Sequence, residues 1–261
     1  MHRFAGSNSF RSVSSLLLMT FLLLSFTACE DDPAKTGWED LPTPDFSGPQ
    51  PGAAEPGARP WQHAGSFYPE DPTELYRGIM GRMRDTGVRE RRAAAAVLTP
   101  HASLRYSGMV QAEVFARISV PEVVVVVASD HEFEGEPFAV WGQGPWLIPG
   151  YRVGVRADLV ADLQGRFPTL ASDEPPFACH PAELQVLWLP YLNPDAEVVG
   201  IAFHDNSYNH FKDWPLERVL EAGDLLAGFI TEREAAGEGV LLLTTTDLVH
   251  REPLDVAREQ D

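Results

Sequence analysis

The fold of this chain is decided by residues 123–131, which read Val-Val-Val-Val-Val-Ala-Ser-Asp-His. An unbroken run of β-branched residues is typical of a strand that is buried on both faces, as in a parallel sheet covered by helices. The run ends in polar residues, so the sequence predicts that His131 follows this strand at its carboxyl end.

Three further apolar runs also lead into histidines. They are Ala93–Leu98 before His101, Val198–Phe203 before His204, and Val240–Leu243 before Asp247 and His250. In open α/β sheets, ligands bind outside the carboxyl ends of the parallel strands, so imidazoles at that edge can converge on one site. Imidazole is the commonest protein ligand for transition metals. The sequence therefore predicts a metal site or an acid–base site at this edge.

Helical patterns separate the predicted strands. The first helix has an N-cap signal, Asp71 followed by Pro72, and apolar residues at helical spacing as far as Met83. The other expected helices are Ser107–Ile118, Ala157–Phe167, Pro181–Tyr191 and Leu216–Ala235, and short extended pieces are expected at Phe138–Trp141 and Tyr151–Val155. This alternation predicts an α/β fold with three αβα layers and a mostly parallel central sheet.

Residues 1–28 are typical of an export signal. Two arginines precede the apolar stretch Leu16–Ala28, which is shorter than the roughly 20 residues that span a bilayer. Small residues followed by Cys29 resemble a bacterial lipoprotein signal, in which the cysteine is lipidated; ordinary secretory cleavage is the alternative. We expect an exported lipoprotein on the periplasmic or cell-surface side, which contacts the membrane only through its lipid anchor.

The segment 29–60 has the composition of a tether. Between residues 30 and 60 there are seven prolines, four glycines and seven acidic residues, so we expect a disordered acidic linker. Residues 61–261 are then one compact α/β domain. Its opening motif, from His63 through Phe67 to Tyr68, is expected to pack the N-terminal segment onto the sheet.

Charge and cysteine content exclude several classes of protein. The net charge of −18 argues against nucleic-acid binding, because phosphates need a basic surface. The two cysteines are Cys29 and Cys179, so lipidation of Cys29 would leave no internal disulfide. The chain has no glycine-rich phosphate loop and no nucleophile elbow, so nucleotide binding and serine-hydrolase chemistry are unsupported.

Five motifs in a fixed order carry a resemblance to a known family. They are Ala64-Gly-Ser-Phe-Tyr-Pro69, Pro100-His-Ala102 with Tyr106-Ser-Gly108, Ser129-Asp-His131, His180-Pro-Ala-Glu183 with Leu189-Pro-Tyr191, and Thr246-Asp-Leu-Val-His250. In this order they resemble the Memo-like family, whose bacterial members are called AmmeMemoRadiSam system protein B. That family is similar in fold to the class III extradiol dioxygenases, which use non-haem iron.

The resemblance implies a metal site. Family members bind iron or copper through histidines that match His101 and His131, together with a cysteine near the C-terminus. The histidines that match His180 and His250 lie in the same pocket. The printed sequence ends at Asp261 without that cysteine, so the third ligand stays open.

Each site residue has a predicted role and a structural alternative. We expect His101 and His131 to hold one transition metal ion, with iron or copper favoured over zinc, unless they are turn histidines bonded to the backbone. His180 is predicted as a general acid or base, with Glu183 one turn away; a helix-capping pair is the alternative. Asp247 and His250 would complete the metal site or orient it.

Three function classes follow. The first is a metal-binding Memo-like protein with redox or oxygen-dependent chemistry on a small molecule. The second is a metal-free hydrolase that uses the same histidines and carboxylates. The third is a noncatalytic, degenerate Memo-like lipoprotein that binds a peptide or a small ligand at the former active-site edge. Metal content separates the first class from the other two.

Overall fold

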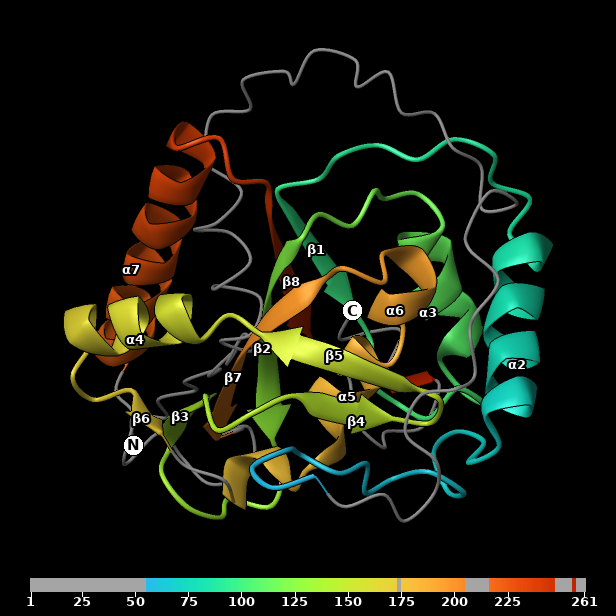
Figure 1. The fold of residues 1–261 in the computed structure, drawn as a ribbon, viewed down its shortest axis with the longest axis horizontal. Coiled ribbons are helices and arrows are strands. Elements are labelled where there is room, and N and C mark those ends of the chain that lie inside the picture. Colours follow the sequence, from blue (N-terminus) through green and yellow to red (C-terminus); the bar gives the residue numbers. More distant parts are fainter. Residues whose placement is uncertain (1–54, 173–174, 205–215, 247–254, 257–261) are drawn as a thin grey trace, which may run out of the picture.

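A computed structural model describes residues 55–172, 175–204, 216–246 and 255–256 (Figure 1). Side chains of residues 216–219 are not described. The predicted signal and most of the predicted linker lie outside these ranges, as do Asp247 and His250. Among the described residues, no helix has the length and apolar character needed to cross a bilayer.

One sheet organises the described part of the chain, with the strand order β1-β8-β2-β7-β3-β6. Its strands are β1 (Ala96–Thr99), β2 (Val123–Asp130), β3 (Phe138–Trp141), β5 (Tyr151–Val155), β6 (Ala171–Ser172), β7 (Glu197–His204) and β8 (Val240–Thr245). The four consecutive strands β1, β8, β2 and β7 are all parallel, whereas β3 runs antiparallel to β7. Strand β4 (Trp146–Ile148) forms an antiparallel pair with β5, which also pairs with β7. The predicted mostly parallel sheet is confirmed, with antiparallel pairing toward one side.

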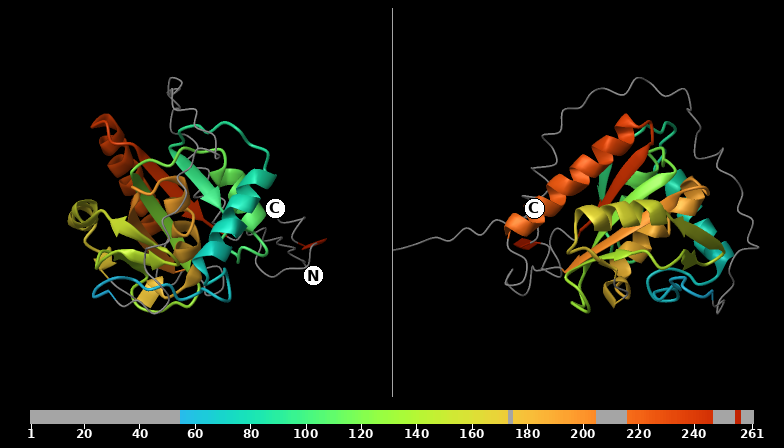
Figure 2. Two further views of the ribbon diagram at one scale, coloured as in Figure 1. Left: turned by 45° about the vertical axis from the view of Figure 1, so that its right-hand side comes forward. Right: turned by 60° about the vertical axis from the view of Figure 1, so that its left-hand side comes forward.

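Helices cover both faces of the sheet, which confirms the three-layer αβα architecture. They are α2 (Pro72–Asp85), α3 (Gly108–Phe115), α4 (Ala157–Arg166), α5 (His180–Val186), α6 (Leu189–Leu192) and α7 (Leu216–Ala235), with a short 3₁₀ turn at Pro175–Phe177. Helices α2, α3, α5 and α6 share one hydrophobic core, whereas α4 and α7 share another on the opposite face. Figures 1 and 2 show α4 and α7 lying apart from α2 and α3.

The valine run of β2 contributes side chains to both hydrophobic cores. Val124 and Val126 belong to the core under α2, α3 and α5, whereas Val123 and Val125 belong to the core under α4 and α7. Alternate side chains of a strand point to opposite faces of the sheet, so an unbroken apolar run is what a doubly covered strand requires.

The start of α2 agrees with its sequence signals. The Asp71 side chain accepts a hydrogen bond from the Glu74 backbone N–H at 2.8 Å, and Pro72 occupies the first turn. Leu75, Ile79 and Met83 are buried along one face. The predicted cap and the apolar spacing are both confirmed.

Some predicted boundaries differ from the structure. The helix expected over Pro181–Tyr191 is two helices, because α5 ends at Val186 and α6 begins at Leu189. Pro190 lies in the first turn of α6; proline has no N–H and clashes with the preceding turn of a continuous helix. Strand β4 was not expected at all, because three residues give too short a pattern to recognise.

The folded domain begins before Trp61. Arg59, which falls in the predicted linker, is only 1% exposed and forms a β-bridge with Trp146. Its guanidinium also lies over the Trp146 ring, 4.5 Å from the centroid. This end of the predicted linker is therefore part of the folded domain.

Candidate metal centre

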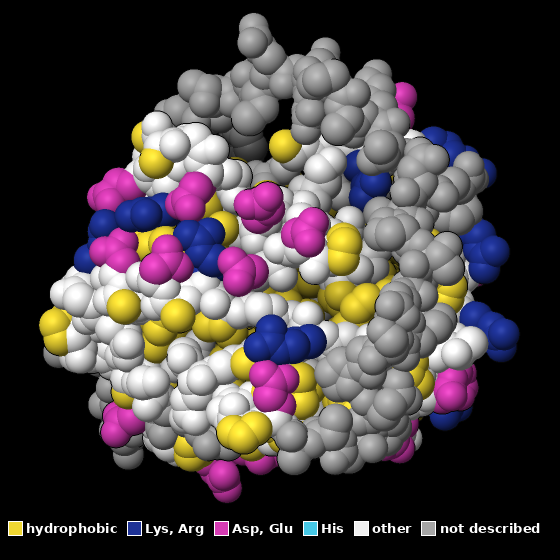
Figure 3. Space-filling model, viewed as in Figure 1, with side chains coloured by type: hydrophobic (Ala, Val, Ile, Leu, Met, Phe, Trp, Pro, Cys, Tyr) yellow, Lys and Arg dark blue, Asp and Glu magenta, His cyan; other side chains and the backbone are white. Residues whose placement is uncertain are grey.

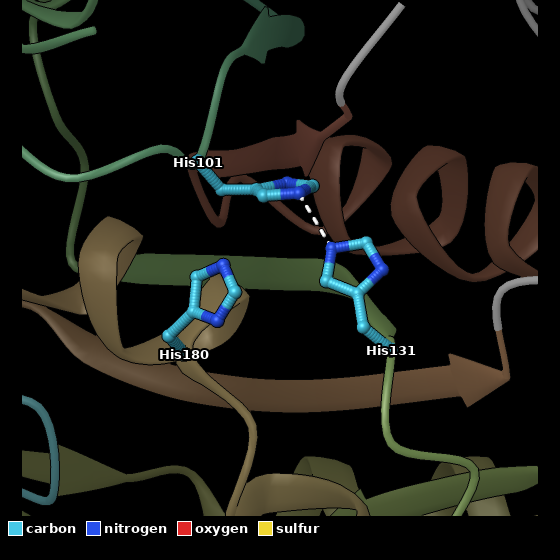
Figure 4. Close-up of side chains that lie close together, drawn as sticks. All are labelled: His101, His131 and His180. Atoms are coloured by element: carbon cyan, nitrogen blue, oxygen red, sulfur yellow. Dashed lines mark hydrogen bonds between the residues drawn. The ribbon is translucent and has the colours of Figure 1, made fainter. Parts of the chain in front are cut away.

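Three histidines from different parts of the chain meet at the carboxyl edge of the sheet (Figure 4). His101 follows β1, His131 follows β2, and His180 is the first residue of α5. Strand β8 lies between β1 and β2, so the two histidines flank its carboxyl end. The sequence pattern predicted this edge for His101 and His131, and the structure brings both there.

The three imidazoles are close enough to share one ligand. His101 Nε2 lies 2.9 Å from His131 Nε2, and one nitrogen of each of the three rings lies within 4.8 Å of the other two. Ring centroids are 4.9 Å apart for His101–His131, 5.6 Å for His101–His180 and 5.5 Å for His131–His180. His101 is fully buried, whereas His131 and His180 are partly exposed.

The donor set fits a transition metal ion. Two nitrogens bound to one ion at roughly 2.0–2.1 Å, with angles between octahedral and tetrahedral values, lie about 2.9–3.4 Å apart. The His101–His131 separation falls in this range, and imidazole nitrogen suits zinc, copper, iron and nickel. His180 supplies the third nitrogen of the group.

The far nitrogen of His101 has a hydrogen-bond partner in the sheet. His101 Nδ1 lies 2.9 Å from the Thr245 hydroxyl, at the end of β8. The Gln185 amide donates to the same hydroxyl at 3.2 Å. Metal-binding histidines usually have such a partner on their second nitrogen, because it fixes the ring and its tautomer.

Cys179 lies beside the cluster as a neutral thiol. Its Sγ accepts a hydrogen bond from the His131 backbone N–H at 3.4 Å and lies 3.9 Å from His180 Nδ1. Burial raises the pKa of the Cys179 thiol to about 11, and the nearby Asp130 carboxylate adds to the rise. A thiol that stays protonated at neutral pH behaves as a small apolar side chain.

The hydrogen bonds of the Glu183 carboxylate go to residues outside the group formed by His101, His131 and His180. Its carboxylate accepts from Arg59 Nη1 and from the Tyr68 hydroxyl, each at 2.5 Å, and from the His63 backbone N–H at 2.9 Å. Burial favours the protonated form of Glu183, but the charge of Arg59 and the Tyr68 hydrogen bond outweigh it and lower the pKa. These contacts favour a structural role for Glu183 over the predicted catalytic one.

The opening motif, predicted only to pack the N-terminal segment onto the sheet, also lies beside His180. The Phe67 ring lies 4.4 Å from the His180 ring, centroid to centroid, and the His63 ring lies 5.7 Å from it. His63 Nε2 is 2.8 Å from the Ala178 carbonyl oxygen, two residues before His180. The Glu183 hydrogen bonds hold this segment down, which explains how a distant motif reaches the site.

His204 belongs to a different contact at the same sheet edge. Its Nε2 lies 3.6 Å from a carboxylate oxygen of Asp130 and outside the three-histidine group. Burial raises the pKa of Asp130, although backbone N–H groups of Glu132 and Glu134 bond to its carboxylate and oppose the rise. Asp247 and His250 lie outside the described residues, so their predicted roles stay predictions.

Comparison with known proteins identifies the family. The family model for Memo-like proteins matches residues 59–261. A protein from Aquifex aeolicus that is named a MEMO1 family protein is 28% identical over 200 residues, which cover 76% of this chain and 69% of that relative. Relatives with the same name from Aeropyrum pernix and Caldivirga maquilingensis are both 29% identical; the matches cover 76% of this chain and 72% and 71% of those proteins. The chain belongs to the Memo-like protein family.

Proposed function

We propose that this protein binds one transition metal ion at the group formed by His101, His131 and His180. The observation that carries the proposal is the 2.9 Å distance between the Nε2 atoms of His101 and His131, which follow separate strands of the sheet. Two imidazoles rarely approach this closely unless a proton or a cation lies between them, because their lone pairs repel.

The chemistry of the donors supports iron or copper over hard cations. Imidazole nitrogen is a borderline donor, and affinity for a nitrogen site rises along the first-row series to copper. Such an ion, when bound, would supply redox or Lewis-acid chemistry toward a small molecule. The partly exposed side of the cluster, at His131 and His180, is where that molecule would approach.

The residues of the site would have two roles, metal binding and proton transfer. The buried ring of His101 and the ring of His131 would hold the ion. His180 is packed against Phe67 and would complete the nitrogen set, or would hold a proton at its imidazole as the sequence analysis expected. Phe67 would exclude water from one side of the His180 ring.

Metal analysis of the purified full-length chain tests the proposal. Without chelator, the wild-type protein should contain close to one equivalent of iron, copper or zinc, and H101A and H131A should each lower the occupancy tenfold or more. His204→Ala is the matched control, because His204 is a sheet-edge histidine outside the group. Unchanged occupancy in both H101A and H131A would overturn the proposal.

His180→Ala decides between the two roles of His180. A fall in occupancy comparable to that of H131A assigns His180 as a ligand. Full occupancy in H180A, with metal lost from H101A, assigns His180 to proton transfer or substrate binding instead.

A further inference from the structure

A chain of buried hydrogen bonds starts at His101 Nδ1, passes through the helix that carries His180, and returns to β1. His101 Nδ1 is bonded to Thr245 Oγ1, Gln185 Nε2 donates to Thr245 Oγ1, and Thr99 Oγ1 donates to Gln185 Oε1 at 2.5 Å. Each of these four side chains is less than 5% exposed. They lie on or after β1, on β8 and on α5, so the chain joins three elements of the site.

The orientation of the Gln185 amide is fixed by a neighbour that can only accept. Gln185 Nε2 lies 3.1 Å from the Pro100 carbonyl oxygen, so the NH₂ group must face that oxygen. Its second N–H is then available for Thr245 Oγ1, and Oε1 is left to accept from the Thr99 hydroxyl. All the hydrogen-bonding groups of this amide are therefore paired in one arrangement.

This arrangement leaves one lone pair of the Thr245 oxygen for His101. A hydroxyl oxygen has two lone pairs, and Gln185 uses one of them. A neutral imidazole that presents the lone pair of Nε2 to an ion carries its proton on Nδ1, and Thr245 Oγ1 is the oxygen placed to accept that proton.

We propose that Gln185 and Thr245 are positioning residues for the metal centre. Through Nδ1 they hold the His101 ring in the orientation that presents Nε2 to His131 and His180. Because Gln185 and His180 share α5, the same amide also sets the place of His180 relative to His101. The expected effect on metal affinity rests on the proposed metal-binding function. The positioning of the His101 ring does not, because it is a property of the metal-free protein.

Affinity for Zn²⁺, measured by competition with a chromophoric chelator, is the first test. Thr245→Val keeps the shape and removes the hydroxyl, and we expect it to raise the Kd roughly tenfold or more, as lost partners of metal-bound histidines do. Thr245→Ser keeps the hydroxyl and should restore wild-type Kd. Thr244→Val is the matched control, because the Thr244 hydroxyl on the same strand bonds to the Val97 carbonyl instead. Equal Kd values for T245V, T245S and T244V would overturn the proposal.

The ¹⁵N resonances of the His101 ring in the metal-free protein are the second test. T245V and Gln185→Met should shift the Nδ1 resonance, whereas T245S and T244V should leave it in place. Unchanged resonances in T245V would overturn the positioning role of Thr245, and unchanged resonances in Q185M would overturn that of Gln185. If T245V fails to fold, Thr245→Ala replaces it.

The two tests separate the failure of this proposal from the failure of the proposed function. A wild-type protein that binds no Zn²⁺, iron or copper overturns the metal-binding function, while the resonances of His101 still decide whether Thr245 and Gln185 position the ring. Tight binding in the wild type, with no effect of T245V or Q185M on either measurement, overturns the positioning alone.

Discussion

Glu183 Oε2 lies 2.5 Å from Arg59 Nη1, and the side chains are 0% and 2% exposed. The two residues are 124 positions apart, so the pair ties the first residues of the domain to α5. The Arg59 guanidinium also donates to the Phe177 carbonyl at 2.8 Å through Nε, and the Tyr68 hydroxyl donates to Glu183. The segment that places Phe67 beside His180 is thus anchored by one buried carboxylate.

Removing either partner of this pair should strongly destabilise the fold. Glu183→Gln or Arg59→Met leaves a buried charge without its counterion, which costs about 3–5 kcal/mol in the free energy of unfolding. Arg152→Ala is the control, because the Arg152–Glu55 pair is exposed, and it should cost less than about 1 kcal/mol. Urea unfolding of the three variants measures the difference, and equal costs for E183Q and R152A would contradict the buried-pair interpretation.

The lowered pKa of Glu183 makes the stability of the fold depend on pH. A carboxyl whose folded-state pKa lies below its ordinary value of 4.5 favours folding fully above that pH, and this contribution is lost as pH falls through the folded pKa. We therefore expect wild-type stability to fall below about pH 4.5 more steeply than that of E183Q. Parallel stability curves for the two proteins, measured by urea unfolding between neutral and acidic pH, would refute this assignment.

The sequence predicts the strands well because their signal is local. The valine run of β2 and the apolar run of β8 need only their own residues to be recognised. Their order in the sheet is a different matter, because β1 pairs with β8 rather than with β2, and nothing near Ala96 or Val240 encodes that pairing. The edge where the histidines meet was predictable, whereas the strand between His101 and His131 was not.

The role of Glu183 shows where local reasoning stops. The spacing of His180 and Glu183 puts both residues near one face of α5, which suggested a catalytic or capping pair. The structure gives the carboxylate partners from the opening segment instead: Arg59, Tyr68 and backbone N–H groups. A partner more than a hundred residues away cannot be read from helical spacing. Arg59 was predicted to lie in the disordered linker because the sequence around it is rich in proline and glycine.

Lipid attachment at Cys29 is a prediction that lies outside the described residues. When the full-length chain is expressed in a bacterium fed a labelled fatty acid, the wild-type protein should carry the label and fractionate with membranes. Cys29→Ala should lose both properties, whereas Cys179→Ala should keep them, because the Cys179 thiol is buried in the folded domain. Label retained in C29A would show that residues 1–28 are processed in another way.

Two glycines should respond in opposite directions to the same substitution. A Cβ on Gly200, in β7, would lie 3.0 Å from Trp146 Cζ2 and 3.5 Å from Phe177 Cε1, between two buried rings. The rings must move apart to admit it, so Gly200→Ala should lower the free energy of unfolding by about 1–3 kcal/mol, as overpacking of a core does.

A Cβ on Gly165, in α4, would meet no atom within 4 Å, and alanine restricts the unfolded chain. Gly165→Ala should therefore stabilise the protein by about 0.5–1 kcal/mol. Thermal unfolding of the two variants checks both signs, and a stabilised G200A would mean that β7 does not pack against Trp146 and Phe177 as closely as described.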